Sequence, residues 1–127
     1  MRLDLDCIRD ILLTIEENTG YNEHITLSER NIITYDLLKE YDSKKVMYHI
    51  IQSGKSNLIE AEQIDLCGNI FIKDLTPYGH KFISNIRENS NWNKVKKVAN
   101  EIGTTSLEAI MQISINVISS IITSRFK

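Results

Sequence analysis

The order of elements between Asp42 and Leu75 constrains the fold of this chain more than any other feature of its sequence. Asp42 and Ser43 supply a chain break and a helix cap, and Gly54 ends the helix that follows. The apolar residues of this helix, 44–53, recur at helical spacing and form its expected buried stripe: Val46, Met47, Ile50 and Ile51. A short amphipathic helix therefore leads directly into the next elements.

Those next elements are two short strands, expected at 58–66 and 70–75. The turn between them falls on Cys67-Gly68-Asn69, because Gly and Asn tolerate positive φ. Thr76-Pro77 then starts another helix, since Thr caps and Pro fits the first helical turn. The sequence thus predicts a β-hairpin held between two helices.

The remaining elements follow from hydrophobic periodicity. Further helices are expected at 4–17, 35–41, 76–89, 92–102 and 106–124, and a short strand at 24–27. The residues expected to face inward from three of these helices are Leu37, Leu38, Tyr41, Tyr78, Phe82, Ile83, Ile86, Trp92, Val95, Ala99 and Ile102. This order predicts a mostly α fold with a small β-hairpin: a winged helix-turn-helix in residues 1–90 and a C-terminal helical extension, for packing or dimerisation, in residues 91–127.

Several strings in the chain also match a known family in combination. They are MRLDLDCIRDILLTIE at 1–16, YDLLKEY at 35–41, VMYHI at 46–50, LTPYGHKF at 75–82, NIRE at 85–88, WNK at 92–94 and SLEAIMQI at 106–113. With these strings the chain resembles an uncharacterised winged-helix family from phages and prophages of Gram-positive bacteria, a domain of unknown function. The resemblance implies a winged helix and a mobile-element origin, and it brings no activity, cofactor or catalytic residue.

In a winged helix, the helix at 43–53 is the surface that meets a DNA duplex and the hairpin at 58–75 is the wing. Phosphates would be neutralised by Lys44, Lys45 and Lys55. Base edges would be reached by Tyr48, His49 and Gln52, which we expect to point outward. Asn69 and Lys73 lie on or near the wing. These eight residues are the predicted DNA- or partner-binding set.

The charge distribution opposes a generic duplex-binding role. Residues 1–90 carry ten basic and fifteen acidic side chains, a net charge of −5, whereas residues 91–127 carry five basic and two acidic ones. A DNA-binding domain usually presents a basic surface. The element order favours a first hypothesis, a non-enzymatic phage regulator that binds duplex DNA. The acidic charge of residues 1–90 motivates the alternative, a phage accessory factor that binds and inhibits a host defence or transcription protein.

Catalytic and metal sites leave no clear mark in the sequence. The three histidines lack a second ligand at helical spacing, and the five glycines are scattered singly, so neither a zinc face nor a phosphate-binding loop is indicated. His80 is interpreted as a partner for nearby backbone. We expect no enzymatic activity, no cofactor and no metal.

Composition and chain ends indicate a soluble cytoplasmic protein. Hydrophobic residues make up 42% of the chain and the net charge is −2, so a real core is expected rather than disorder. The two cysteines make no disulfide framework. The start, Met-Arg-Leu-Asp-Leu-Asp, does not read as a leader peptide.

The last helix is apolar over about 200° of its circumference, whereas a helix packed on one side needs about 100°. We therefore expect a second subunit to cover part of it in a homodimer, and the alternative is a monomer that folds this helix fully inward. A membrane surface is the less favoured partner, because the polar face lacks Lys and Arg. The residues predicted to form the dimer contact are Leu107, Ile110, Met111, Ile115, Ile118, Ile121 and Ile122.

Overall fold

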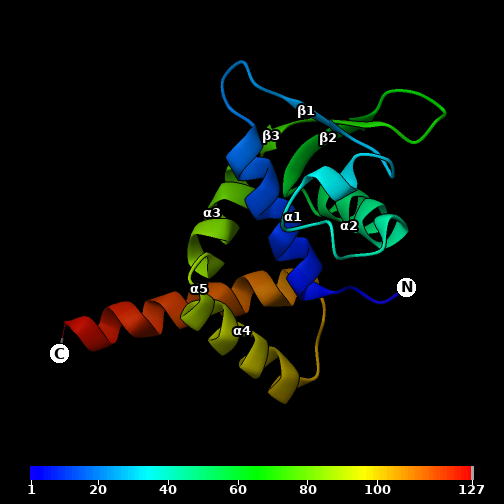
Figure 1. The fold of residues 1–127 in the computed structure, drawn as a ribbon. Coiled ribbons are helices and arrows are strands. Elements are labelled where there is room, and N and C mark those ends of the chain that lie inside the picture. The colour runs from blue at the N-terminus through cyan, green and yellow to red at the C-terminus, as the bar shows by residue number, and fades with distance from the viewer. Residues whose placement is uncertain (127) are drawn as a thin grey trace. The chain divides into compact units, whose positions relative to one another are not determined.

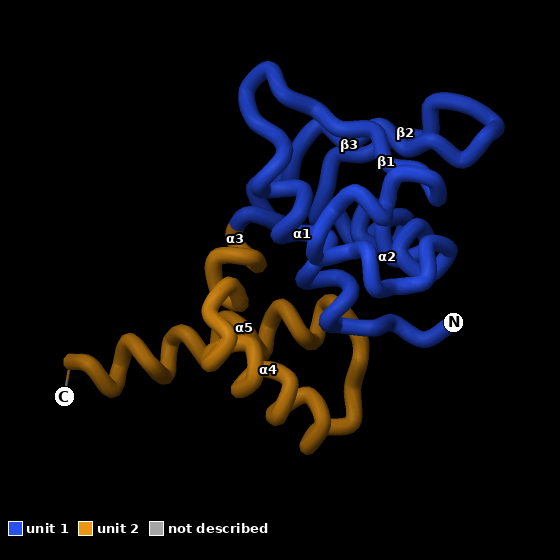
Figure 2. Tube along the Cα trace, viewed as in Figure 1, with its two compact units in different colours: residues 1–80 blue, residues 81–127 orange. Residues whose placement is uncertain are grey.

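The computed structural model describes residues 1–126, and within them it contains five α-helices and one small antiparallel sheet (Figure 1). The chain divides into two compact units, residues 1–80 and residues 81–127 (Figure 2). The elements are α1 (Leu5–Asn18), β1 (Ile25–Leu27), the 3₁₀ helix η1 (Ile32–Thr34), α2 (Ser43–Lys55), β2 (Ile59–Gln63), β3 (Ile70–Leu75), α3 (Pro77–Ile86), α4 (Asn89–Ile102) and α5 (Leu107–Arg125). The prediction of a mostly helical chain with a small β-element is confirmed.

The sheet has three strands in the order β1-β3-β2, so β3 lies in the centre and β2 forms one edge. Both pairings are antiparallel, and β2 is irregular at Glu60/Ala61. The connection between β2 and β3 turns at Gly68, whose φ of 85° favours glycine. The predicted hairpin is confirmed, and the strand expected at 24–27 joins it as β1.

The core of the first unit lies where α1 and α2 pack against each other and α1 packs on β3. Ile8, Ile11, Leu12 and Ile15 recur along one face of α1 and are all buried. Asp4 begins this helix, since its side chain accepts a hydrogen bond from the Cys7 N–H at 3.2 Å. The sheet is thereby fixed against two helices.

The prediction of a helix at 35–41 is wrong. Residues 35–41 form a series of turns after η1, in which the Tyr35 carbonyl accepts hydrogen bonds from the N–H groups of both Leu38 and Lys39. Leu38 is buried but Leu37 is 42% exposed, against expectation. A helix of seven residues makes too few hydrogen bonds to offset the free-energy cost of helix nucleation. The segment therefore stays a series of turns, held in place by the buried side chain of Leu38.

The buried stripe of α2 differs from the expected one. Successive helical residues are about 100° apart, so Ile51 lies about 140° from Val46, whereas His49 and Ser53 lie within about 60° of it. Accordingly His49 and Ser53 are fully buried and Ile51 is 44% exposed. The prediction that Ile51 faces inward is wrong.

Two further inward assignments are wrong, at helix ends. Tyr78 lies in the first turn of α3 and is 42% exposed, and Ile102 lies in the last turn of α4 and is 66% exposed. Terminal turns reach past the elements they pack on, which leaves their side chains in solvent. Thr76 does begin α3 as predicted, because its Oγ1 accepts the Gly79 N–H at 2.9 Å.

In the second unit α4 and α5 pack against each other. Trp92, Val95 and Ala99 form the buried face of α4, and Gly103 ends the helix in the left-handed conformation. Ser106 caps α5, where its Oγ accepts the Ala109 N–H at 3.5 Å. By length and composition alone α5 could cross a membrane, and one such helix in a chain is weak evidence of spanning.

Candidate functional site

The basic residues predicted on α2 differ in their solvent exposure and in whether they form an ion pair. Lys44 and Lys55 are exposed. Lys45 is bound to Asp4, with 2.5 Å between Nζ and Oδ2, and its Nζ lies 5.6 Å from the centre of the Tyr41 ring. Burial would raise the pKa of Asp4, but the hydrogen bond from Lys45 and the one from the Cys7 N–H hold it below its usual value. Lys45 therefore stabilises the fold locally.

His49 was predicted to reach base edges, and the structure places it inside the protein instead. Its side chain is fully buried. Its Nε2 accepts the Asp4 N–H at 2.8 Å, so its Nδ1 carries the proton and donates to the Lys45 carbonyl at 2.7 Å. The prediction that His49 points outward is wrong, because helical geometry sets it beside Val46 and Ser53 on the packed side of α2.

The other two predicted α2 contacts, Tyr48 and Gln52, are half-buried. The Tyr48 hydroxyl lies 3.5 Å from the Met1 carbonyl. Of the six predicted α2 residues, only Lys44 and Lys55 are therefore exposed.

The loop between β2 and β3 is organised by Asp65. Its Oδ1 accepts the Cys67 N–H at 2.8 Å, and its Oδ2 accepts from the Asn69 side chain at 2.7 Å. These hydrogen bonds, the one from Asn69 first, lower the pKa of the carboxyl group. Asn69 thus shapes the loop, while Ile64 and Leu66 are 51% and 101% exposed.

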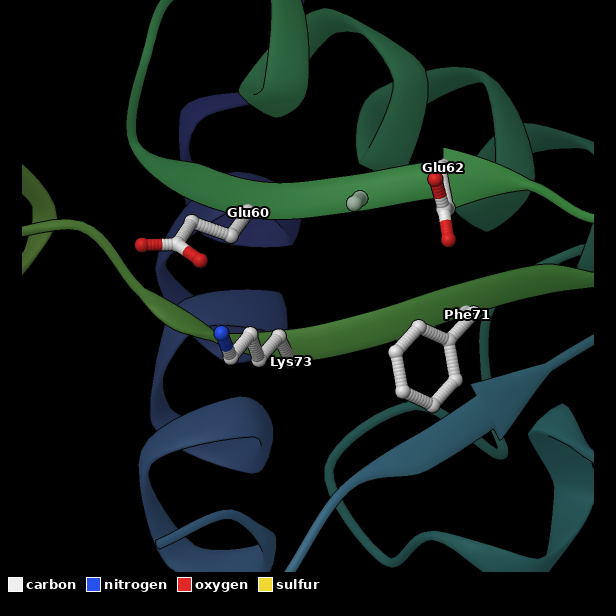
Figure 3. A pocket seen from close by; sticks show the side chains of 5 residues that line it. Glu60, Glu62, Phe71 and Lys73 are labelled. Carbon is white, nitrogen blue, oxygen red and sulfur yellow. The ribbon is translucent and has the colours of Figure 1, made fainter. Parts of the chain in front are cut away.

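The outer face of the sheet carries a shallow pocket of about 280 Å³. Its lining comes from Glu60, Ala61 and Glu62 on β2 and from Phe71 and Lys73 on β3 (Figure 3). Glu62 is the carboxylate beside the Phe71 ring, to which it is paired in the register, while Glu60 lies toward Lys73 (Figure 3). On the β1 side of the ring, the His24 ring meets it edge-on, with 5.4 Å between the ring centres. Lys73 is exposed here, the only basic residue in the lining.

A second hollow, of about 290 Å³, runs between α2 and β2. We call it the β2 groove; it is lined by Ile50, Ile51, Gly54, Lys55, Ala61, Glu62, Gln63 and Ile70. Ala61 and Glu62 border this groove and also the outer pocket. The strand β2 therefore has a carboxylate-rich hollow on one side and a mainly apolar one on the other.

Glu60, Glu62, Phe71 and Ile51 were missed by the reasoning from sequence. The signal was present in the two-residue alternation of Ile59-Glu60-Ala61-Glu62, which points successive side chains to opposite sides of a strand.

The titratable side chains in the described part of the chain form neither a metal site nor a nucleophile–base pair. Residues 1–126 contain no group of three or more His, Cys, Asp and Glu side chains placed to hold a metal ion. His80 Nε2 lies 3.4 Å from Asp74 Oδ1, which in turn accepts from Thr19 Oγ1 at 3.2 Å. In that set the carboxylate stands between the hydroxyl and the imidazole, so the histidine is not placed to activate the hydroxyl.

The predicted dimer residues fall into two groups along α5. Leu107, Ile110 and Met111 are buried in the N-terminal half of the helix. In the C-terminal half Ile115 and Ile122 are 41% and 52% exposed. Ile118 and Ile121 are half-buried.

Comparisons with known proteins reveal similarity without an assigned activity. A family model described as "Hypothetical protein (DUF2513)" matches residues 2–106. An "Uncharacterized protein" of Haemophilus influenzae is 28% identical over 125 residues, which cover 96% of this chain and 99% of that protein. No solved structure matches.

Proposed function

The chain belongs to the family described as "Hypothetical protein (DUF2513)", and from the geometry of residues 1–80 we propose that it is a non-enzymatic winged-helix protein that binds an extended segment of another protein along β2. This places the chain among protein-binding factors, of the kind a phage uses against a host defence or transcription protein.

The winged-helix assignment rests on element order and sheet pairing. The order α1, β1, α2, β2, β3 with β1 paired to β3 matches a helix, a first strand, a recognition helix and a wing. In this proposal η1 and the turns at 35–41 take the place of the usual second helix.

One observation carries the binding proposal: β2 is an edge strand whose residues 60–63 are all exposed, with a hollow on each side. An edge strand presents unpaired backbone groups that can bind an added strand. Peptide recognition by strand addition takes its affinity from the main chain and its specificity from pockets for alternate side chains.

The two hollows define the chemistry of the partner. On the outer side the hollow is lined by Phe71, with Glu62 beside its ring, and by Glu60 farther along β2. This lining suits a Lys or Arg side chain through charge and cation–π attraction. On the other side Ile50 and Ile51 favour Val, Ile or Leu. The partner segment therefore alternates basic and aliphatic residues.

The state of the predicted DNA-contacting residues favours a protein partner over duplex DNA. Lys45 is paired with Asp4, and His49 is buried. The wing carries four carboxylates against one lysine, Lys73: Glu60, Glu62, Asp65 and Asp74. Carboxylates in a wing repel phosphate.

A peptide-display selection tests the proposal. Random twelve-residue peptides are selected on the intact protein and then measured against the double variant Glu60→Lys, Glu62→Lys. We expect enriched peptides that alternate basic and aliphatic residues and lose at least tenfold in affinity for this variant. The matched control is Glu17→Lys, Glu40→Lys, which makes the same charge change at exposed positions off the site and is expected to bind like the parent protein.

Two results would contradict the proposal. One is enriched peptides that bind the parent and the β2 variant equally well. The other is salt-dependent binding of a duplex DNA that is lost in Lys44→Glu, Lys55→Glu, since that outcome assigns the surface to nucleic acid.

A further inference from the structure

The C-terminal half of α5 presents apolar side chains that its own unit leaves uncovered. Figure 2 shows this half of the helix extending away from α4 within the second unit. On one side, Val117 and Ile121 border a hollow of about 430 Å³ beside Lys94, Lys97 and Val98 of α4. Ile115 and Ile122 lie outside that hollow and are exposed.

A second feature of α5 is a heptad strip with a palindromic spacing. Its members follow one another at intervals of three, four, three, four and three residues: Glu108, Met111, Ile115, Ile118, Ile122 and Arg125. Such a 3-4 repeat keeps one side of a helix facing a partner helix along its length. Because the intervals read the same in both directions, the strip fits a second copy of itself running antiparallel.

The antiparallel register also brings opposite charges together. With a two-fold axis between Asn116 and Val117, Ile115 lies opposite Ile118 of the second copy, and Glu108 lies opposite Arg125. These two charges are exposed, and no charged residue stands between them in the sequence. Ile115 and Ile118 thus meet across the axis, and the only two charges of the strip meet each other. Ile122 faces the position of Met111 in the second copy.

We propose that α5 pairs antiparallel with α5 of a second copy of this chain, through the strip that runs from Glu108 to Arg125. Met111 is already buried within one chain, so Ile115, Ile118 and Ile122 supply the apolar contact. A membrane surface fits this helix less well, because its polar side carries Gln, Asn, Ser and Thr where interfacial helices carry Lys and Arg. This pairing is independent of ligand binding at β2.

The experiment exchanges the two charges and measures mass by light scattering coupled to size exclusion. The parent protein is expected at twice 14.7 kDa at micromolar concentration. Glu108→Arg and Arg125→Glu each place like charges opposite one another, and each is expected to weaken the dimer at least tenfold. The double exchange restores opposite charges and with them the dimer, which a parallel pairing would not do.

Two further variants and a vesicle-binding assay complete the test. Asn116→Arg adds an exposed charge well away from the strip around the helix and is expected to leave the dimer intact. Ile118→Asp is expected to give a monomer that circular dichroism shows to be folded. A parent mass of 14.7 kDa, or a double exchange as weak as either single one, overturns the proposal. Binding to a membrane surface instead of a second copy would also overturn it. In that case the parent co-sediments with phosphatidylcholine–phosphatidylglycerol vesicles, Ile118→Asp abolishes this co-sedimentation, and the parent in solution has the mass of a monomer.

Discussion

The backbone N–H of Asp4 donates a hydrogen bond to Nε2 of His49 at 2.8 Å, and this contact joins residues 45 positions apart. It fixes the start of α1 against the middle of α2 inside the first unit. The same histidine donates from Nδ1 to the Lys45 carbonyl, so the ring is neutral and both nitrogens have partners. A residue predicted to recognise a ligand is instead part of the scaffold that holds α2.

Replacing His49 is therefore expected to affect stability rather than binding. In His49→Phe the Asp4 N–H loses its acceptor, and a buried unsatisfied donor costs about 1–3 kcal/mol in free energy of unfolding. Urea denaturation followed by circular dichroism measures the change. Tyr48→Phe is the control, because its half-buried hydroxyl makes only a 3.5 Å contact, and it is expected to change stability by less than about 0.5 kcal/mol. Equal effects of the two variants would contradict this role.

The pairing of Asp4 with Lys45 is expected to appear as a pH dependence. The pKa of Asp4 is lowered in the folded protein, so its contribution to stability is present above the unfolded pKa and is lost as pH falls through the folded value. Asp4→Asn keeps a capping oxygen and removes the charge. At neutral pH it is expected to cost between about 0.2 and 1 kcal/mol, because the pair is partly exposed.

The difference between the parent and Asp4→Asn should shrink as pH falls below the usual pKa of an aspartate, and it should vanish once the folded carboxyl of Asp4 is protonated. Urea titrations at neutral and acidic pH provide the comparison. A difference in free energy of unfolding that persists unchanged in acid would mean that the asparagine alters the packing or the helix cap rather than the ion pair.

Sequence periodicity was sufficient to predict most of the fold and failed at particular side chains. The helices around Ile8, Met47 and Val95 were predictable because a wide apolar face repeats over three or more turns. The segment at 35–41 looked the same by pattern, yet seven residues form a helix only if several side chains have a surface to pack on, and only Leu38 is fully buried. That condition depends on tertiary packing, which the local pattern does not contain.

The candidate site was less predictable, for a related reason. Ile51 and His49 lie on either side of the core residue Ile50 in the sequence, and only the direction of the packed face decides which of them is buried. The carboxylates at 60 and 62 could have been predicted from strand alternation. The approach of Glu62 to Phe71 depends on the pairing of these two residues in the register, which the sequence of either strand alone does not fix.

Gly79 provides a test of how closely the start of α3 approaches the residue before β2, and Gly54 in α2 serves as the comparison. A Cβ at Gly79 would lie 2.0 Å from the Leu58 carbonyl oxygen, and that oxygen is backbone. At Gly54 the nearest atom would be Ile59 Cγ1 at 3.9 Å, an ordinary contact. Gly79→Ala is therefore expected to cost more than about 2 kcal/mol through overpacking. Gly54→Ala is expected to add about 0.5–1 kcal/mol, because alanine favours the helix.

Thermal unfolding of the two glycine variants gives the measurement. The expected outcome is opposite shifts of the midpoint, downward for the α3 variant and upward for the α2 variant. A midpoint for Gly79→Ala close to that of the parent would contradict the close approach of α3 to the start of β2.

The two cysteines are expected to differ in reactivity by their environment. Cys7 is fully buried in α1, and burial together with the nearby charge of Asp4 raises its pKa to about 12. Cys67 is exposed in the loop between β2 and β3. Because the thiolate is the reactive form, an aromatic disulfide reagent at about pH 8 should modify one thiol per chain rapidly, and the second only after denaturation. Cys67→Ser should abolish the rapid reaction and Cys7→Ser should leave it unchanged. Rapid reaction of both thiols in the folded parent would show that α1 opens on the timescale of the assay.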